Sequence, residues 1–209
     1  MGQPNVAVDV CNLMLLEMKE KQISSISPPD NGSTTALKCS LAYENTRRQV
    51  LRDHPWNFAS NRKTISAEAA APAFGWAYAY KVPNDFVRLN GLGQDTDNPW
   101  PSNMYEFENN QVLTDEAAPL YMRYVSNFED VSKMPADFIH AFALKLGANT
   151  CYGITGNRAL ANDFLAKYDK YMISVRAVDG QERPPTRVQK SALLTARSRR
   201  SPKNDWRKW

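Results

Sequence analysis

The sequence is poor in histidine and cysteine, the side chains that most often carry catalysis and metal binding. It holds two histidines, His54 and His140, and three cysteines, Cys11, Cys39 and Cys151, among 209 residues. The odd number of cysteines, each in an apolar helix-like stretch, argues against a disulfide framework and favours assembly in a reducing compartment. Because none of them has a Cys or His partner at zinc-site spacing, the sequence predicts no metal centre.

Long hydrophobic runs are equally scarce. The aliphatic run at residues 13–16 is far shorter than the roughly 20 residues that a transmembrane helix needs. The first ten residues lack a basic segment followed by an apolar one, so we expect no secretion signal. With 43% hydrophobic and 23% charged residues, the composition is that of an ordinary soluble globular protein, and no membrane contact is expected.

Candidates for catalysis are correspondingly weak. His140 and Cys151 lie eleven residues apart, so they form a thiol or hydrolase site only if the tertiary fold brings them together. Two carboxylate pairs, Asp95 with Asp97 and Glu106 with Glu108, resemble parts of acid–base or metal sites, but such pairs in a loop or on an exposed strand are more often solvated charge. Gly91 and Gly93 resemble part of a phosphate-binding loop, but the remainder of that motif is missing. The sequence therefore predicts no catalytic residue, no cofactor and no enzyme activity, with a small hydrolase left as a rival.

Positive charge is concentrated near one end of the sequence. Residues 181–209 hold nine Lys or Arg against two acidic residues, a net charge of +7, while the other residues hold 17 basic and 20 acidic ones, a net charge of −3. This stretch opens on Pro184-Pro185 and has few apolar residues, so we expect an extended tail that is unfolded in the free protein. Its arginines and tryptophans suit nucleic acid or an acidic protein surface: Arg197, Arg199, Arg200, Trp206 and Trp209.

Apolar spacing predicts helices in the N-terminal part of the chain. The first covers about residues 6–20, and its apolar face is widened by Cys11, Leu15 and Met18. The residues placed at the centre of that face are Val6, Val10, Leu13, Met14 and Glu17. The second helix covers residues 34–53.

Helical spacing returns in the C-terminal part of the sequence. A third helix begins near Pro135, because proline suits the first turn of a helix, and the chain is interrupted again by Gly153 and Gly156. The fourth helix repeats apolar residues at steps of three and four over residues 160–178 and is closed by Gly180.

Between residues 62 and 133 the helical spacing gives way to strand signals. One strand is predicted from four side chains that alternate with smaller or charged residues: Trp76, Tyr78, Tyr80 and Val82. Further strands follow over residues 86–92, 104–108, 111–113 and 120–125. The two middle ones join in a hairpin at Asn109-Asn110, because asparagine tolerates a positive φ. Together these segments predict a small antiparallel β region.

The stretch RRQVLRDHPWNF, residues 47–58, leads from the helical part to the β part. Pro55 cannot continue a helix and favours extended backbone at His54, so the second helix should end there. Trp56 and Phe58 follow at strand spacing, and both are expected to point into one core. We predict that they anchor the β region to the helices, with an ordinary helix end and two core aromatics as the alternative.

The predicted fold class is therefore α+β. Helices from the N- and C-terminal parts form a bundle, a small antiparallel β region is inserted between them, and an extended tail follows. The expected parts are residues 1–61 and 134–180 for the bundle, residues 62–133 for the β insertion, and residues 181–209 for the basic tail.

Six segments in this order resemble one family: NLMLLEM, VLRDHPWNFASNRKTI, FGWAYAYKVPNDFVRLNGL, YEFENNQVLTD, PLYMRYVSN and MPADFIHAFALKLGANTCYGITGN. Over about residues 5–180 the chain is similar to the head-to-tail adaptors of short-tailed bacteriophages, also called tail tubular protein A. The most specific pieces are HPWNFA and YKVPNDFVRL, and no catalytic motif takes part. Where the family often has a glycine after the first helix, this chain continues with Lys19 and Glu20, so that helix is expected to run longer.

The resemblance implies a structural virion protein of the neck or tail, assembled in the cytoplasm of a host bacterium. Copies would form a ring below the portal protein, twelve to match a portal, and extend the DNA channel. The ring would give the tail nozzle protein a docking platform, and genomic DNA would pass through without specific binding. The basic tail would then dock on the portal, and the alternative is a basic-tailed nucleic-acid-binding protein.

Overall fold

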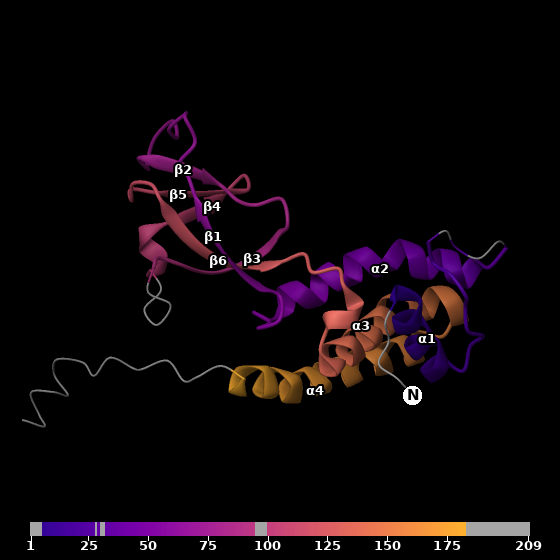
Figure 1. The fold of residues 1–209 in the computed structure, drawn as a ribbon. Helices are drawn as coiled ribbons and strands as arrows, with labels where there is room; N and C mark the ends of the chain where they lie inside the picture. The colour runs from indigo at the N-terminus through magenta and orange to yellow at the C-terminus, as the bar shows by residue number, and fades with distance from the viewer. Residues whose placement is uncertain (1–5, 28, 30–31, 95–99, 183–209) are drawn as a thin grey trace, which may run out of the picture.

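The computed structural model describes the chain except for residues 1–5, 28, 30–31, 95–99 and 183–209. The described residues form four α-helices, two three-stranded antiparallel sheets and two short 3₁₀ turns. The predicted α+β class is thus confirmed. The helices gather in one body, and the sheets stand off from one end of it (Figure 1).

The helical body is built around its third helix. The helices are α1 (Ala7–Met18), α2 (Thr34–Asp53), α3 (Ala136–Thr155) and α4 (Arg158–Gln181). Helix α3 packs against each of the other three helices. Because it is covered on several sides, its buried residues lie on several of its faces. Gly147 lets α4 approach closely, because a Cβ built there would lie 2.5 Å from the Phe164 ring.

Side-chain caps set where two of the helices begin. The Ser33 hydroxyl accepts the Ala36 N–H (3.1 Å) at the start of α2, whose bounds agree with the predicted residues 34–53. The Asn157 side chain accepts the Leu160 N–H (3.1 Å) at the start of α4. Both satisfy a backbone donor that has no partner within its helix.

The predicted extent of the first helix was wrong. The helix ends at Met18, because Lys19 takes the left-handed conformation (φ 61°) that a glycine would adopt more easily. Its buried face is also rotated from the predicted one, since Val6 is exposed and the buried residues are Val10, Cys11, Met14, Leu15 and Met18.

Two predictions about glycines at helix ends were also wrong. Gly153 lies inside α3, and only Gly156, with a φ of 71°, ends that helix. Gly180 does not close α4, which continues to Gln181.

The β region contains two sheets. One has the order β1-β6-β3, formed by Ser60–Ile65, Leu120–Ser126 and Phe86–Leu92, and the other has the order β2-β5-β4, formed by Tyr78–Lys81, Gln111–Thr114 and Glu106–Glu108. The hairpin predicted at Asn109-Asn110 is confirmed, because both residues have positive φ (47° and 57°) between β4 and β5.

Two strand predictions fail. No strand was predicted over β1, although it is a full edge strand that begins at Ser60, two residues before the expected start of the insertion. The strand predicted from Trp76 starts only at Tyr78, whose side chain is exposed, while Ala79 and Tyr80 are both buried. Because that strand is short and pairs along one side only, its buried and exposed side chains do not simply alternate.

The described residues form two separate hydrophobic cores. The larger lies among the helices and reaches residues at the near end of the first sheet, such as Val87 and Val125. The smaller lies between the two sheets and is formed by Tyr80, Val82, Leu92, Val112, Leu120, Met122 and Tyr124. The segment around Trp56 belongs to the larger core and leads directly into β1.

Candidate functional site

Trp56 lies where the bundle meets the sheets, with only 1% of its surface exposed. Its indole Nε1–H donates to the Val50 carbonyl of α2 (2.8 Å). Its ring lies edge-on to His54 (centroids 4.9 Å apart) and to Phe138 of α3 (5.0 Å). The tryptophan therefore fixes the chain immediately after α2 against the central helix.

Phe58 continues this aromatic cluster but is only half-buried. Its ring packs edge-on against Phe138 (4.8 Å) and Phe128 (5.5 Å), and it lies 6.0 Å from the ring of Trp56. The strand spacing expected for Trp56 and Phe58 was wrong, because residues 57–59 form a turn and β1 begins only at Ser60. Both rings nevertheless reach the same phenylalanine of α3.

Asp179 supplies the polar half of this contact from the last turn of α4. Its carboxylate accepts from His54 Nε2 (2.9 Å) and from the Asn57 N–H (3.1 Å), and its carbonyl accepts from the Asn57 side chain. An acid near a helix C-terminus is disfavoured by the helix dipole, and these donors offset that cost. We call His54, Trp56, Asn57, Phe58 and Asp179 the joint. The sequence reasoning missed Asp179. The only signal for it was its place beside Gly180, the glycine that was predicted to end the helix.

Arginine side chains tie α2 to the sheets in a second place. The buried Arg47 meets the carboxylates of Glu44 (2.7 Å) and Glu129 (3.3 Å) and donates to the Asn127 amide oxygen (3.3 Å) in the segment that leaves β6. The two acids and the amide compensate the charge at Nη2, while the buried Nε has no hydrogen-bond partner.

The end of α2 and the start of β3 exchange a pair of hydrogen bonds. Arg52 donates to the Val87 carbonyl (3.2 Å), and Arg88 donates to the Arg52 carbonyl (2.9 Å). Together with the joint, these contacts hold the sheets to the bundle from two strands, β1 and β3.

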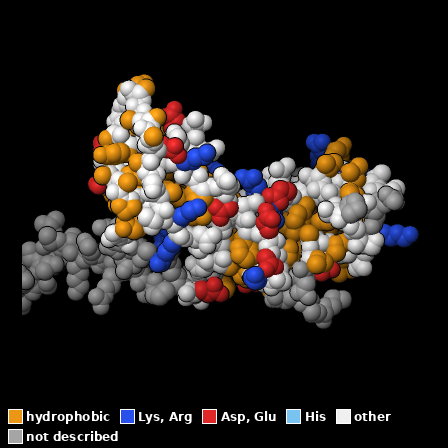
Figure 2. Space-filling view, turned by 45° about the horizontal axis from the view of Figure 1, so that its top comes forward, with side chains coloured by type: hydrophobic (Ala, Val, Ile, Leu, Met, Phe, Trp, Pro, Cys, Tyr) orange, Lys and Arg blue, Asp and Glu red, His pale blue; other side chains and the backbone are white. Residues whose placement is uncertain are grey.

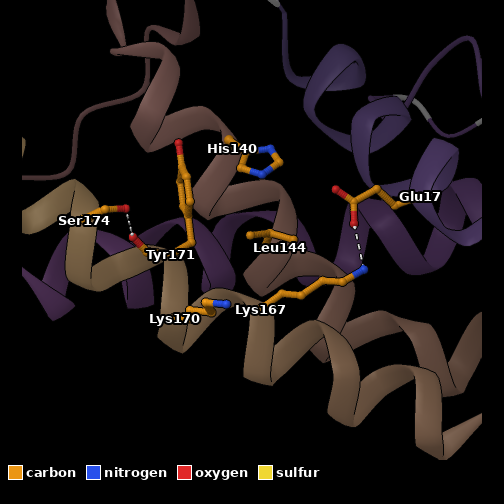
Figure 3. Close-up of a pocket in the computed structure, with 7 residues that line it drawn as sticks. All are labelled: Glu17, His140, Leu144, Lys167, Lys170, Tyr171 and Ser174. Carbon is orange, nitrogen blue, oxygen red and sulfur yellow. Dashed lines mark hydrogen bonds and ion pairs between the residues drawn. The ribbon is translucent and has the colours of Figure 1, made fainter.

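A groove of about 680 Å³ opens on the bundle between α1, α3 and α4 (Figure 3). It is lined by Glu17, His140, Leu144, Lys167, Lys170, Tyr171 and Ser174. His140 lies edge-on to Tyr171 (4.8 Å), whose hydroxyl donates to Asp137 (3.0 Å). Burial and this hydrogen bond raise the pKa of Tyr171 to about 12, so the phenol stays neutral. Lys167 is paired with Glu17 (3.6 Å) and Asp163 (3.2 Å).

The structure does not bring His140 and Cys151 together. Both lie on α3, and eleven residues of helix separate them by roughly 16 Å. The buried Cys151 sulfur instead lies 3.5 Å from the Thr155 hydroxyl and 3.9 Å from the Asn157 carbonyl. Within the described ranges, no group of three His, Cys, Asp or Glu side chains is placed to hold a metal ion.

The predicted tail residues lie outside the described part of the chain: Arg197, Arg199, Arg200, Trp206 and Trp209. Asp95 and Asp97 also fall outside it. Glu106 and Glu108 are both exposed on β4, and the Glu106 carboxylate accepts from the Trp76 indole (3.0 Å).

Large apolar side chains are exposed on both the sheets and the bundle. On the sheets, Phe74 is 87% exposed beside a hollow of about 490 Å³ lined largely by residues 70–76. On the bundle, Leu41 of α2 is 70% exposed and Ile173 of α4 is 73% exposed. Figure 2 shows hydrophobic side chains over the sheets and over the bundle, with charged side chains gathered between them. Sequence reasoning placed Leu41 beside the apolar face of the second helix, where it is instead exposed, and did not single out Phe74 or Ile173.

No protein-family model matches the chain, and no curated protein matches it. Among the described helices, none is both long enough and apolar enough to cross a bilayer.

Proposed function

We propose that this chain is a structural subunit of a ring, a head-to-tail adaptor of the kind found in short-tailed bacteriophages. The observation that carries the proposal is the division into a bundle and a β region, held in a fixed arrangement by the joint and each bearing exposed apolar side chains. A ring subunit needs two different faces that meet on neighbouring copies, and a rigid body is needed to hold those faces at a constant angle.

The segments that carry the family resemblance support this proposal by their positions. HPWNFA contains His54, Trp56, Asn57 and Phe58, which are most of the joint. YKVPNDFVRL runs from β2 through a turn into β3, and its Arg88 bonds back to the end of α2. The resemblance therefore rests on the residues that fix the two regions relative to each other.

Two helix faces suit the contact between copies. In Figure 1 the central helix α3 lies between α2 and α4, which places their outer faces on different sides of the bundle. Leu37 and Leu41 are exposed on α2, and Leu165 and Ile173 are exposed on α4. The proposed ring contact is heterologous, with the α2 face of one copy against the α4 face of the next.

The proposed partners follow from this role. Twelve copies bind the portal protein, the nozzle protein docks on the ring, and the particle assembles in the bacterial cytoplasm before it becomes part of the virion. The basic tail docks on the portal. A net charge of −3 outside the tail suits a channel that lets DNA pass, because binding phosphates requires concentrated Lys and Arg.

The ring contact is tested with two charge variants, Leu41→Glu and Ile173→Glu. Each should fold normally, because the side chain is exposed, and each should fail to complete a ring on the portal in electron micrographs. Mixed together they should form dimers, because each variant keeps the face that the other lacks. Leu16→Glu is the control, since Leu16 is 57% exposed on α1, outside both faces. Complete rings from either variant would disprove this contact.

The tail is tested separately by removing residues 196–209. The truncated chain should keep its circular dichroism and melting temperature but dock more weakly on the portal. If the truncation instead abolished DNA retention on a gel and left portal docking intact, the nucleic-acid-binding alternative would replace the adaptor.

A further inference from the structure

Two arginines face each other on the outer side of the first sheet. Arg62 of β1 and Arg123 of β6 are direct partners in the antiparallel register, so their side chains project from the same face of the sheet. The other face carries Met122 and Tyr124, which are buried between the sheets. Like charges placed directly opposite each other destabilise a pair of strands unless an anion compensates them.

Two nitrogens of the half-buried Arg123 side chain lack hydrogen-bond partners. Its Nε and Nη1 atoms are both shielded from solvent and have no hydrogen-bond partner. Such unpaired buried donors are rare and point to an ion or water that completes the site. Arg47 differs in part: its Nε also lacks a partner, but its Nη2 meets Glu44, Glu129 and Asn127, whereas Arg123 forms no ion pair with a described acidic residue.

A cavity of about 310 Å³ opens beside these arginines. Its lining residues include Arg62, Lys63 and Arg123, together with Gly93, Gln94 and Tyr121. None of the described residues that line it is acidic. Two arginines with no acidic side chain among the described lining residues match a doubly charged anion better than a single carboxylate.

We propose that this cavity binds a phosphate group, with Arg123 and Arg62 as the principal ligands. The guanidinium fork matches phosphate oxygens, and the bound anion would remove the repulsion between the two arginines. The site is independent of the proposed ring and goes beyond it. The phosphate group has two sources, free phosphate or the backbone of a nucleic acid, and both present the same oxygens.

The test uses the full chain with two probes, inorganic phosphate and a duplex DNA of about 20 base pairs, a length that offers many backbone phosphates. Calorimetry should detect phosphate binding to the wild type. Arg62→Gln and Arg123→Gln should each weaken it at least about tenfold, since each removes a charge-assisted hydrogen bond. Lys21→Gln is the matched control, because Lys21 is exposed outside the site, and it should leave binding unchanged.

The two arms separate the sources. If Arg62→Gln weakens phosphate binding but leaves DNA binding unchanged, the site takes free phosphate. If it weakens DNA binding as well, the backbone of a nucleic acid is the source. Arg62 is an exposed edge-strand residue, so this variant folds even if Arg123→Gln does not. Unchanged binding of both probes by Arg62→Gln and by a folded Arg123→Gln, or no phosphate binding by the wild type, would overturn the proposal.

Discussion

The bundle and the β region differ in how they are stabilised. The core among the helices holds 30 buried residues, whereas the core between the sheets holds seven, so hydrophobic burial alone favours the bundle much more strongly. The β region adds polar contacts, such as the Tyr80 hydroxyl on the Glu116 carbonyl (2.8 Å) and the Tyr124 hydroxyl on Asp85 (3.1 Å).

This difference gives the joint its importance. A region with so small a core depends on its attachment to a larger one, and Trp56 with Asp179 provides that attachment at the start of β1. We therefore expect the bundle to be the more stable body and the sheets to lose structure first when the joint is weakened.

The largest effect is expected from Trp56→Ala. The indole is fully buried against α2 and α3, so its removal should lower the free energy of unfolding by about 3–5 kcal/mol. Hydrogen exchange should accelerate more in the sheets than in α3. Phe74→Ala is the control, because Phe74 is 87% exposed and its removal should change stability by less than about 0.5 kcal/mol. A cost below about 1 kcal/mol for Trp56→Ala would mean that Trp56 does not hold the two regions together.

The next effect concerns the bundle alone. Gly147→Ala would place a Cβ 2.5 Å from the Phe164 ring, and the overpacking should cost about 1–3 kcal/mol by thermal unfolding. Gly180→Ala is the matched control on α4, because a Cβ there meets open space and should stabilise the helix by about 0.5–1 kcal/mol. Equal melting temperatures for the two variants would contradict the close approach of α3 and α4.

Asp179→Ala should have a more local effect. It removes the acceptor of the Asn57 N–H and of His54, and leaving such donors unpaired costs about 1–3 kcal/mol. Amide exchange should rise at Asn57 and in β1, with little change in α3. Asp169→Ala, an exposed site on the same helix, serves as the control. Uniform loss of protection across the molecule would show that Asp179 does not act through the joint.

The smallest effect on stability is expected at alkaline pH. Burial and the hydrogen bond to Asp85 raise the pKa of Tyr124 from 10.0 to about 12. The folded state therefore keeps a proton that the unfolded state loses, and this contribution to stability, complete below pH 10, disappears as the pH rises towards 12. In the Tyr124→Phe variant, the free energy of unfolding of the sheets, measured by urea unfolding, should fall less steeply between pH 10 and 12. An unchanged slope would contradict the assignment.

The sequence predicted the elements whose ends are chemically marked. The bounds of α2 were predicted correctly from its apolar spacing and from Pro55 after its end, and the structure adds a Ser33 cap at its start. The strand β1 was missed because its side chains are mostly exposed, so SNRKTI shows no alternation. The end of α1 was wrong because a lysine, rather than glycine, adopts the left-handed turn.

The sites were harder to predict than the fold. Trp56 stood out because a large aromatic residue follows a helix-ending proline, but its partner Asp179 lies 123 residues away in sequence. The pairing of Arg62 with Arg123 depends on strand register, which no local pattern reveals. The tail residues Arg197 to Trp209 are outside the described structure, so their portal docking stays a prediction.

The most direct test of the central claim is native mass spectrometry of the purified chain mixed with its portal protein. The proposed adaptor predicts twelve copies of the chain on each portal, whether or not a ring forms without it. Portal particles that carry single copies, or that show no rotational symmetry in the added density, would contradict the account.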